Sequence, residues 1–199
     1  MNFHRVTILA TSKVLLMALW LAASSISFGA DLAPIIDDFS DANNNSLGFP
    51  RYFMNDSMSG GGTTTQQKIA EGIISYNGDI APPRGQPGWA SVALLLDAQG
   101  LPKDASSFEG IRLLLKVNAG NISVSANSIE ITNFDYHAAS VVVKADGKFH
   151  EIKIPFISMK RSWSEQIPLN TKTLSSISIT AYDMAKGSFD FSVDEVSFY

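Results

Sequence analysis

The sequence contains no cysteine, and this absence removes several kinds of chemistry at once. A chain without thiols has no disulfide, no thiolate metal site, no cysteine nucleophile and no lipid-modified cysteine. Charge is also sparse, at 17% of residues, and 15 basic against 19 acidic residues give a formal net charge of −4. Proteins that bind nucleic acid neutralise phosphates with a surplus of lysine and arginine. The sequence therefore predicts no nucleic-acid partner.

Helical patterning is missing as well, although 45% of the 199 residues are hydrophobic. Apolar residues instead alternate with polar ones, as in the run from Ile111 through Leu113 and Leu115 to Val117. Such alternation is typical of antiparallel strands with one buried face. Further alternating runs lie at 122–131, 152–154, 177–179 and 189–198. We expect an all-β fold, a β-sandwich or jelly roll of about nine or ten antiparallel strands.

The first thirty residues have a different composition from the rest of the chain. They contain no Asp or Glu, and Arg5 and Lys13 precede an apolar run at 14–23 and then several small residues. This arrangement is typical of a secretory signal peptide. The apolar run is shorter than the roughly 20 residues that a membrane-spanning helix needs. Extending it back to Val6 reaches that length, so an uncleaved anchor remains the alternative.

We therefore expect a signal peptide at 1–30, a single sandwich domain at 31–199, and export to the periplasm or the medium. Cleavage after Gly29 or Ala30 leaves 13 basic and 19 acidic residues, a net charge of −6, and no stable transmembrane span.

Motifs for catalysis are few. His137 and His150 are the only histidines after residue 30, and the chain has neither a Gly-x-Ser-x-Gly nor a His-Glu-x-x-His motif. Gly60 to Gly62 are followed by threonines rather than by lysine, which favours a surface turn over a phosphate-binding loop. Carboxylate pairs that hydrolyse glycosides are recognised by their separation in space. We expect no enzyme, with a glycan-active enzyme as a minor alternative.

Two acidic pairs are the candidates for a metal site. Asp37 and Asp38 stand at the first predicted strand, and Asp194 and Glu195 lie in the last. The terminal strands of many sandwiches are neighbours, so these carboxylates could share a hard cation such as calcium. The alternative is that they are solvated charges at strand ends. A structural calcium ion is thus the one cofactor that the sequence suggests.

Six short motifs follow one another in order. Segment 55–63 is similar to a D-x-x-M-G-G-x-S pattern, 72–78 to G-x-L-x-x-x-G, 88–92 to G-F-A-S-V, 107–113 to G-Y-E-G-L-R-L, 154–156 to L-P-F, and 190–196 to F-x-L-x-I-D-x-I. Together they resemble the complex I intermediate-associated protein 30 domain family over about residues 35–199. The departures are Ser59 before the glycine run, Thr63 in place of Ser, and an extended loop at 82–85.

This resemblance implies a galactose-binding-like jelly roll, generally non-catalytic and similar to carbohydrate-binding module family 11. Eukaryotic members of the family assist the assembly of a respiratory complex inside mitochondria, a compartment that an exported chain does not share.

A binding module would use aromatic side chains, because sugar rings stack on aromatic faces. Each candidate ring has core packing as its alternative, above all Trp89 beside Ala90 and Val92. We expect an exported, non-catalytic module that recognises a carbohydrate or a protein partner through a cleft on one sheet. The alternative is an assembly or scaffolding factor of the cell envelope, which an exposed apolar patch would favour. The candidate ligand-binding residues are Tyr52, Asp56, Trp89, Tyr136, His137 and Trp163.

Overall fold

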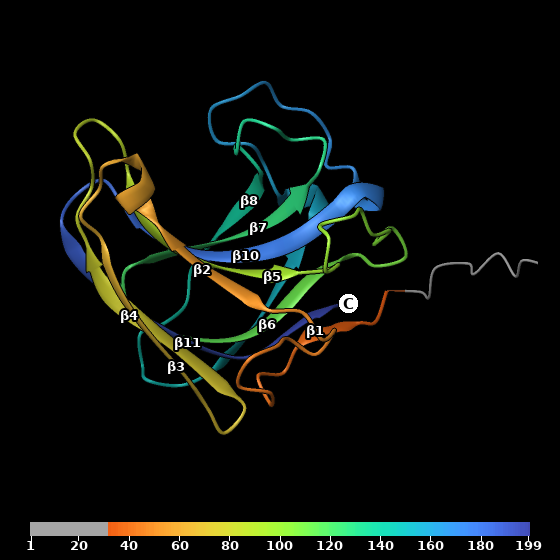
Figure 1. Cartoon of the computed structure of the whole chain (residues 1–199), viewed down its shortest axis with the longest axis horizontal. Coiled ribbons are helices and arrows are strands. Elements are labelled where there is room, and N and C mark those ends of the chain that lie inside the picture. The colour runs from red at the N-terminus through yellow and green to blue at the C-terminus, as the bar shows by residue number, and fades with distance from the viewer. Residues whose placement is uncertain (1–31) are drawn as a thin grey trace, which may run out of the picture. The chain divides into compact units, whose positions relative to one another are not determined.

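The computed structural model describes residues 32–199, which form two antiparallel sheets packed face to face (Figure 1). The six-stranded sheet has the order β3-β4-β11-β6-β9, with β1 paired to β11, and the five-stranded sheet has the order β2-β5-β10-β7-β8. The predicted signal peptide and its cleavage site lie outside the described residues. Within 32–199 no helix is long and apolar enough to cross a bilayer.

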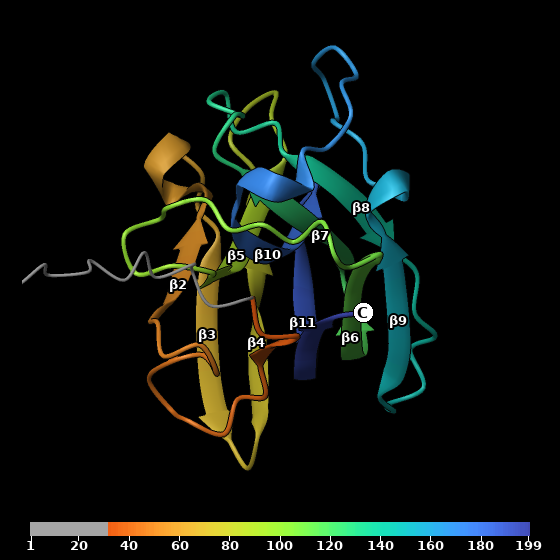
Figure 2. The ribbon, with the colours of Figure 1, turned by 90° about the vertical axis from the view of Figure 1, so that its right-hand side faces the viewer.

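The described part of the chain has eleven strands and three short 3-10 turns (Figure 2). The strands are β1 (Ile35–Asp37), β2 (Arg51–Asn55), β3 (Thr64–Ala70), β4 (Ile73–Ile80), β5 (Gly88–Leu95), β6 (Gly110–Ala119), β7 (Asn121–Ser128), β8 (His137–Val141), β9 (His150–Pro155), β10 (Leu174–Asp183) and β11 (Gly187–Phe198). The turns are η1 (Asp56–Ser59), η2 (Phe156–Ser158) and η3 (Thr171–Thr173).

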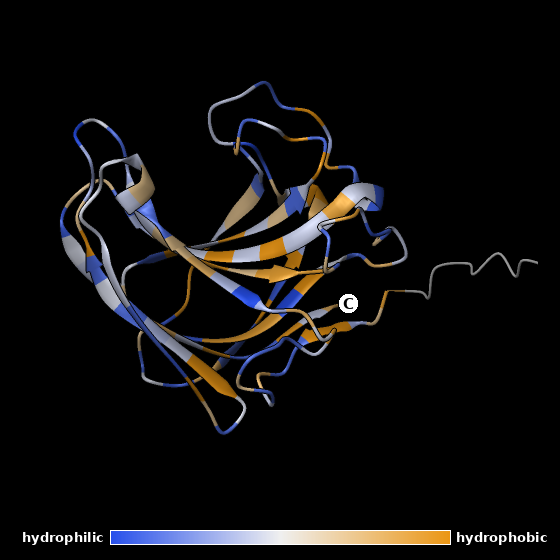
Figure 3. Ribbon diagram, viewed as in Figure 1, coloured by the Kyte–Doolittle hydropathy of each residue, from blue (hydrophilic) through white to orange (hydrophobic). Residues whose placement is uncertain are grey.

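Alternation along the strands builds the core, as the hydrophobic bands along the ribbon indicate (Figure 3). In β6 the side chains of Ile111, Leu113 and Leu115 are fully buried between the sheets. β10 contributes Ile177 and Ile179 from the opposite sheet. The all-β jelly-roll prediction is confirmed, and the terminal strands are neighbours because Ile35 pairs with Ser197.

The predicted alternating run from 122 to 131 is interrupted in the structure. β7 ends at Ser128, whose backbone carbonyl accepts from the Ile131 amide at 3.1 Å. The Ser128 hydroxyl accepts from the Glu130 amide, also at 3.1 Å. These bonds turn the chain, so Ile129 and Ile131 belong to a connection and not to a strand.

Candidate functional site

The side of the five-stranded sheet that faces away from the core carries little charge. Alternation turns no charged side chain outward along its strands, and the one carboxylate of residues 32–199 in contact with it is that of Asp183 at the end of β10, which accepts from the Asn121 side chain at 3.0 Å. We call this surface the outer face. Strand register and burial place sixteen side chains on it, all of them aliphatic, aromatic, hydroxyl or amide groups. They are Tyr52 and Met54 of β2; Trp89, Ser91, Ala93 and Leu95 of β5; Ser176, Ser178, Thr180 and Tyr182 of β10; Asn121, Ser123, Ser125 and Asn127 of β7; and Ala138 and Ser140 of β8.

The corresponding side of the six-stranded sheet is different in character. Arg112 on β6 forms ion pairs with Glu151 of β9 and Glu195 of β11. The other charged side chains on that side are Lys68, Asp79, Lys116, Lys153 and Asp190. The two sides of the sandwich thus differ in the charge of their side chains.

Tyr182 lies across the outer face. Its hydroxyl is 3.0 Å from the Ser140 hydroxyl on β8, and β7 runs between the strands that carry these two residues. Strands two apart in a sheet are separated by about 9.6 Å, so the tyrosine side chain must lie nearly parallel to the sheet to reach that far. Tyr182 also pairs with Trp89 on β5. The two aromatic residues therefore stand side by side on neighbouring strands.

Small hydroxyl and amide groups form the floor beside these rings. The Ser91 and Thr180 hydroxyls are 2.8 Å apart, and the Asn127 side-chain amide donates to Ser176 and Ser178 at 2.9 and 2.7 Å. Ser176 and Ser178 are only 8% and 7% exposed although they face away from the core. Neighbouring groups therefore cover most of these two hydroxyls, which are hydrogen-bonded within the surface of the sheet.

Three of the predicted ligand-binding aromatics lie along this surface. Tyr52 is exposed on β2, and Trp89 is half-buried on β5. Trp89 is not a core residue, because Ala90 and Val92 point inward and the alternation turns Trp89 outward. Tyr136 directly precedes β8, where alternation sets it on the same side as Ala138, and burial raises its pKa. Tyr182 was missed, although it follows Thr180 in the outward-facing alternation of its strand.

Asp56 and His137 are not presented on the outer face. Asp56 is fully buried, and its carboxylate accepts from the Thr63 amide and hydroxyl at 3.1 and 2.7 Å and from the Trp89 amide at 3.1 Å. It fixes the start of β5. His137 is buried on the inward side of β8, with Nε2 at 2.7 Å from the Ile167 carbonyl. Both residues support loops from inside.

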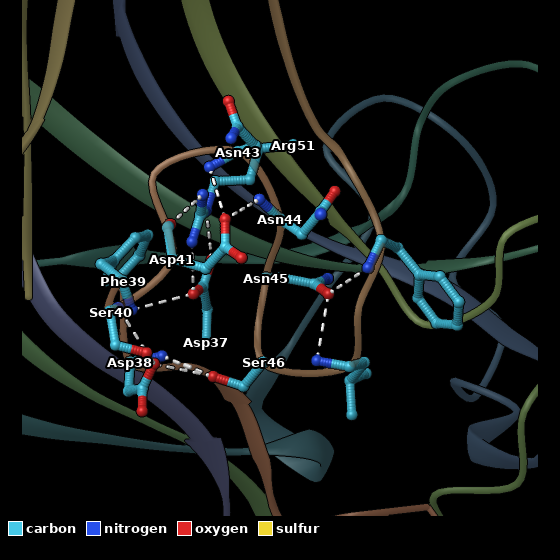
Figure 4. Close-up of polar contacts among 12 residues, drawn as sticks. Asp37, Asp38, Phe39, Ser40, Asp41, Asn43, Asn44, Asn45, Ser46 and Arg51 are labelled. Atoms are coloured by element: carbon cyan, nitrogen blue, oxygen red, sulfur yellow. Dashed lines mark hydrogen bonds and ion pairs between the residues drawn. The ribbon is translucent and has the colours of Figure 1, made fainter.

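Three of the four predicted calcium ligands have other partners, as Figure 4 shows for the first pair, and the fourth, Asp194, is partly exposed on β11. Both oxygens of Asp37 bind the Arg51 guanidinium, at 2.6 and 2.8 Å, and Asp38 accepts from Ser40 and Ser46. Glu195 pairs with Arg112. Within residues 32–199 no three His, Asp or Glu side chains converge as a ligand set. A calcium ion shared by Asp37, Asp38, Asp194 and Glu195 therefore has no preformed site there.

Two recesses lie elsewhere on the surface. One of about 470 Å³ is on the charged side of the six-stranded sheet, beside Asp79 and Asp190. The other, of about 520 Å³, lies between η2 and residues 166–169 and is bordered by Ile157 and Ile167. Neither combines exposed rings with a hydroxyl floor, as the outer face does.

These features define a jelly-roll β-sandwich with one neutral, aromatic-bearing face. The chain is similar in fold to the family 11 carbohydrate-binding module of the cellulase Lic26A-Cel5E from Clostridium thermocellum, with 20% identity, a TM-score of 0.59, and 85% of this chain and 95% of that one covered. It is also similar to the C. thermocellum family 11 module in complex with a β-1,3-1,4-mixed-linked tetrasaccharide, with 19% identity, a TM-score of 0.58, and coverage of 83% and 94%.

An agarase structure matches with 9% identity and a TM-score of 0.54, over 83% of this chain and 26% of that one. The family model for complex I intermediate-associated protein 30 matches residues 40–193, and the chain therefore belongs to this family. No curated protein sequence matches the chain.

Proposed function

We propose that this protein is a non-catalytic module that binds a neutral polysaccharide through the outer face. The observation that carries the proposal is Tyr182, which pairs with Trp89 and reaches over β7 to the Ser140 hydroxyl. Most of the other side chains on the outer face are serine, threonine or asparagine. Aromatic faces stack on the apolar faces of sugar rings, and hydroxyl and amide groups bond to sugar hydroxyls. The absence of charge among the outer-face residues favours a neutral ligand.

The expected affinity is modest. An aromatic contact contributes about 0.5–1.5 kcal/mol beyond buried area. Two or three such contacts with accompanying hydrogen bonds correspond to dissociation constants in the millimolar to micromolar range, or about 4–8 kcal/mol. An affinity in this range is sufficient for a module that binds a polymer, because the polymer offers many equivalent binding sites.

The test compares variants of two rings with a matched control on the other sheet. We expect Tyr182→Ala and Trp89→Ala each to weaken binding of the β-1,3-1,4-mixed-linked tetrasaccharide about two- to tenfold in calorimetric titration. The melting temperature should change little. The control is Phe149→Ala, because Phe149 packs against Lys116 on the charged side of the six-stranded sheet.

Two results would count against the proposal. One is equal binding by the Tyr182 and Phe149 variants. The other is a native protein that binds none of the neutral glycans on an array.

We also propose that the protein works outside the cytoplasm, supported by the charge and hydropathy of residues 1–30. N-terminal sequencing of the exported form should read Ala30 or Asp31 as the first residue. An intact Met1 in a membrane fraction would instead support an uncleaved anchor.

A protein partner is the second candidate, and one observation favours it. Ile157 and Ile167 are exposed at the edge of the apolar recess beside η2. Exposed apolar patches frequently mark protein interaction sites. If the module is a scaffolding factor of the envelope, Ile157→Asp should abolish recovery of a partner from envelope extracts, whereas Tyr182→Ala should not.

A further inference from the structure

We infer that two loops, residues 133–136 and 161–166, form a rigid aromatic end to the outer face that holds the far part of a long neutral polysaccharide. We call this element the aromatic end. The inference rests on the proposed function, and it adds the prediction that binding depends on chain length. Figures 1 and 2 show both loops rising beyond the strands at one end of the five-stranded sheet.

A buried carboxylate joins the two loops. Asp135 is 1% exposed, and it accepts from three consecutive backbone amides of the second loop: Ser162 at 2.7 Å, Trp163 at 3.0 Å and Ser164 at 2.6 Å. Burial by itself would raise the pKa of Asp135, but the amide groups and Ser164 together hold it below its ordinary value. The carboxylate is therefore charged at neutral pH and binds the second loop firmly.

A guanidinium group strengthens the same junction. Arg161 donates to the Asp135 carbonyl at 3.1 Å, to the Asn133 side chain at 3.1 Å and to the Glu165 carbonyl at 3.2 Å. The Asn133 side chain in turn donates to the Ser164 hydroxyl at 3.0 Å. Two segments that lie about thirty residues apart in the sequence are thus bonded into one unit.

This rigid unit displays two large apolar rings to solvent. Phe134 is 77% exposed and Trp163 is 71% exposed, so neither contributes to the core. Phe134 also has a φ of 63°, a left-handed conformation that is strained for a bulky residue. Strained backbone that the surroundings hold in place is concentrated at binding and catalytic sites. Rings fixed in this way are suited to contact a ligand.

The aromatic end is continuous with the floor of the outer face. Phe134 makes an edge-to-face contact with Tyr136 at 6.4 Å between ring centroids. Continuing the β7–β8 register sets Tyr136 beside Asn127, whereas Tyr182 pairs with Asn121. Six strand residues span about 20 Å between the backbones of Asn121 and Asn127. Because the Tyr182 hydroxyl reaches Ser140, four residues or about 13 Å of strand separate that hydroxyl from Tyr136.

The side chains between Tyr182 and Tyr136 are Ser123, Ser125, Ala138 and Ser140, which are small and uncharged. One extended sugar chain could therefore contact rings at both ends of this strip. A short sugar could contact only one end.

The experiment measures binding of cellobiose and of soluble β-1,3-1,4-mixed-linked glucan by the native protein and by Phe134→Ala, Trp163→Ala and Phe149→Ala variants. We expect the native protein to bind the polymer, per binding site, more tightly than the disaccharide. Phe134→Ala and Trp163→Ala should each weaken polymer binding about two- to tenfold and leave disaccharide binding unchanged. Phe149→Ala should change neither.

The conservative variant Asp135→Asn tests whether rigidity is needed. It keeps both rings but removes the charge that orders the second loop, so it should weaken polymer binding and leave disaccharide binding intact. Unchanged polymer binding by the Phe134 and Trp163 variants would overturn the inference and leave the proposed function standing. Equal weakening for polymer and disaccharide would also overturn it. A native protein that binds neither sugar would refute the proposed function and the inference together.

Discussion

Replacing Asp37 with alanine should destabilise this protein strongly, because the substitution leaves a buried charge without its partner. The Asp37 and Arg51 side chains are 0% and 1% exposed, and they meet through two hydrogen bonds of 2.6 and 2.8 Å. Asp37 also accepts from the Phe39 amide at 2.9 Å. Removing one member of such a buried pair costs about 3–5 kcal/mol.

The expected change is large enough to measure by heat or denaturant. For a domain of this size each kcal/mol lowers the melting temperature by about 2–4 °C, so Asp37→Ala should lower it by roughly 6–20 °C. Asp38→Ala is the matched control, because Asp38 is exposed and its carboxylate accepts only from the Ser40 amide and the Ser40 and Ser46 hydroxyls. Its cost should be about 1 kcal/mol.

A double variant separates the charge from the packing. Asp37→Leu combined with Arg51→Met removes both charges, so it should cost much less than the sum of the two single changes. Calorimetry at neutral pH would measure the native protein, Asp37→Ala, Asp38→Ala, the single variants Asp37→Leu and Arg51→Met, and the double variant. The reasoning is refuted if Asp37→Ala costs no more than Asp38→Ala, or if the double variant costs as much as the two single changes added together.

Three further outcomes can be measured on the same preparations. Gly78→Ala should cost about 1–3 kcal/mol in urea unfolding, because an added Cβ would lie 1.9 Å from the Thr64 carbonyl oxygen. Gly187→Ala, where a Cβ meets nothing within 4 Å, is its control. Acid should destabilise the fold, because two carboxyl groups have pKa values below the ordinary 3.8. Hydrogen bonds from Ser40 lower the pKa of Asp38, and hydrogen bonds from the Asn44 and Asn43 amides lower the pKa of Asp41. A carboxyl group whose pKa is lower in the folded state stabilises the protein above pH 3.8, and this stability is lost as the pH falls through the folded-state pKa. Melting temperatures that stay constant from pH 3 to 7 would therefore contradict the lowered pKa values of Asp38 and Asp41. Sugar binding at the neutral outer face should change less than about twofold between low and high salt, and a steep salt dependence in titration would point to a charged site instead.

Much of the architecture could be predicted from alternation alone. The run from Ile111 to Val117 predicted β6, because successive side chains on a strand point to opposite faces of the sheet. The alternate apolar residues of this run are the ones that face the core. The same reasoning failed at Ile129 and Ile131, where two bonds to Ser128 turn the chain. The spacing of apolar residues indicates which side chains are buried, but it does not indicate where hydrogen bonds turn the chain.

The candidate site was only partly predictable, since it depends on which strands are neighbours. Tyr52 and Trp89 could be selected as aromatic residues, but nothing in the sequence tells that Tyr182 reaches over β7 to Ser140. Asp56 was predicted to bind ligand together with the aromatic residues, whereas its carboxylate is buried and accepts from the Thr63 and Trp89 amides. Contacts between segments that are far apart in the sequence determine where the Tyr182 and Asp56 side chains lie.

The unequal distribution of charge between the two sheets affects how molecules would be arranged on a polymer. A molecule that docks by its neutral outer face turns the opposite sheet, with Arg112, Lys116 and Asp190, toward the solvent. Charges of both signs keep a surface hydrated and unfavourable for close stacking. Neighbouring copies could then cover a sugar chain densely as a single layer, with a water-compatible outer surface, and without building further layers on top of one another.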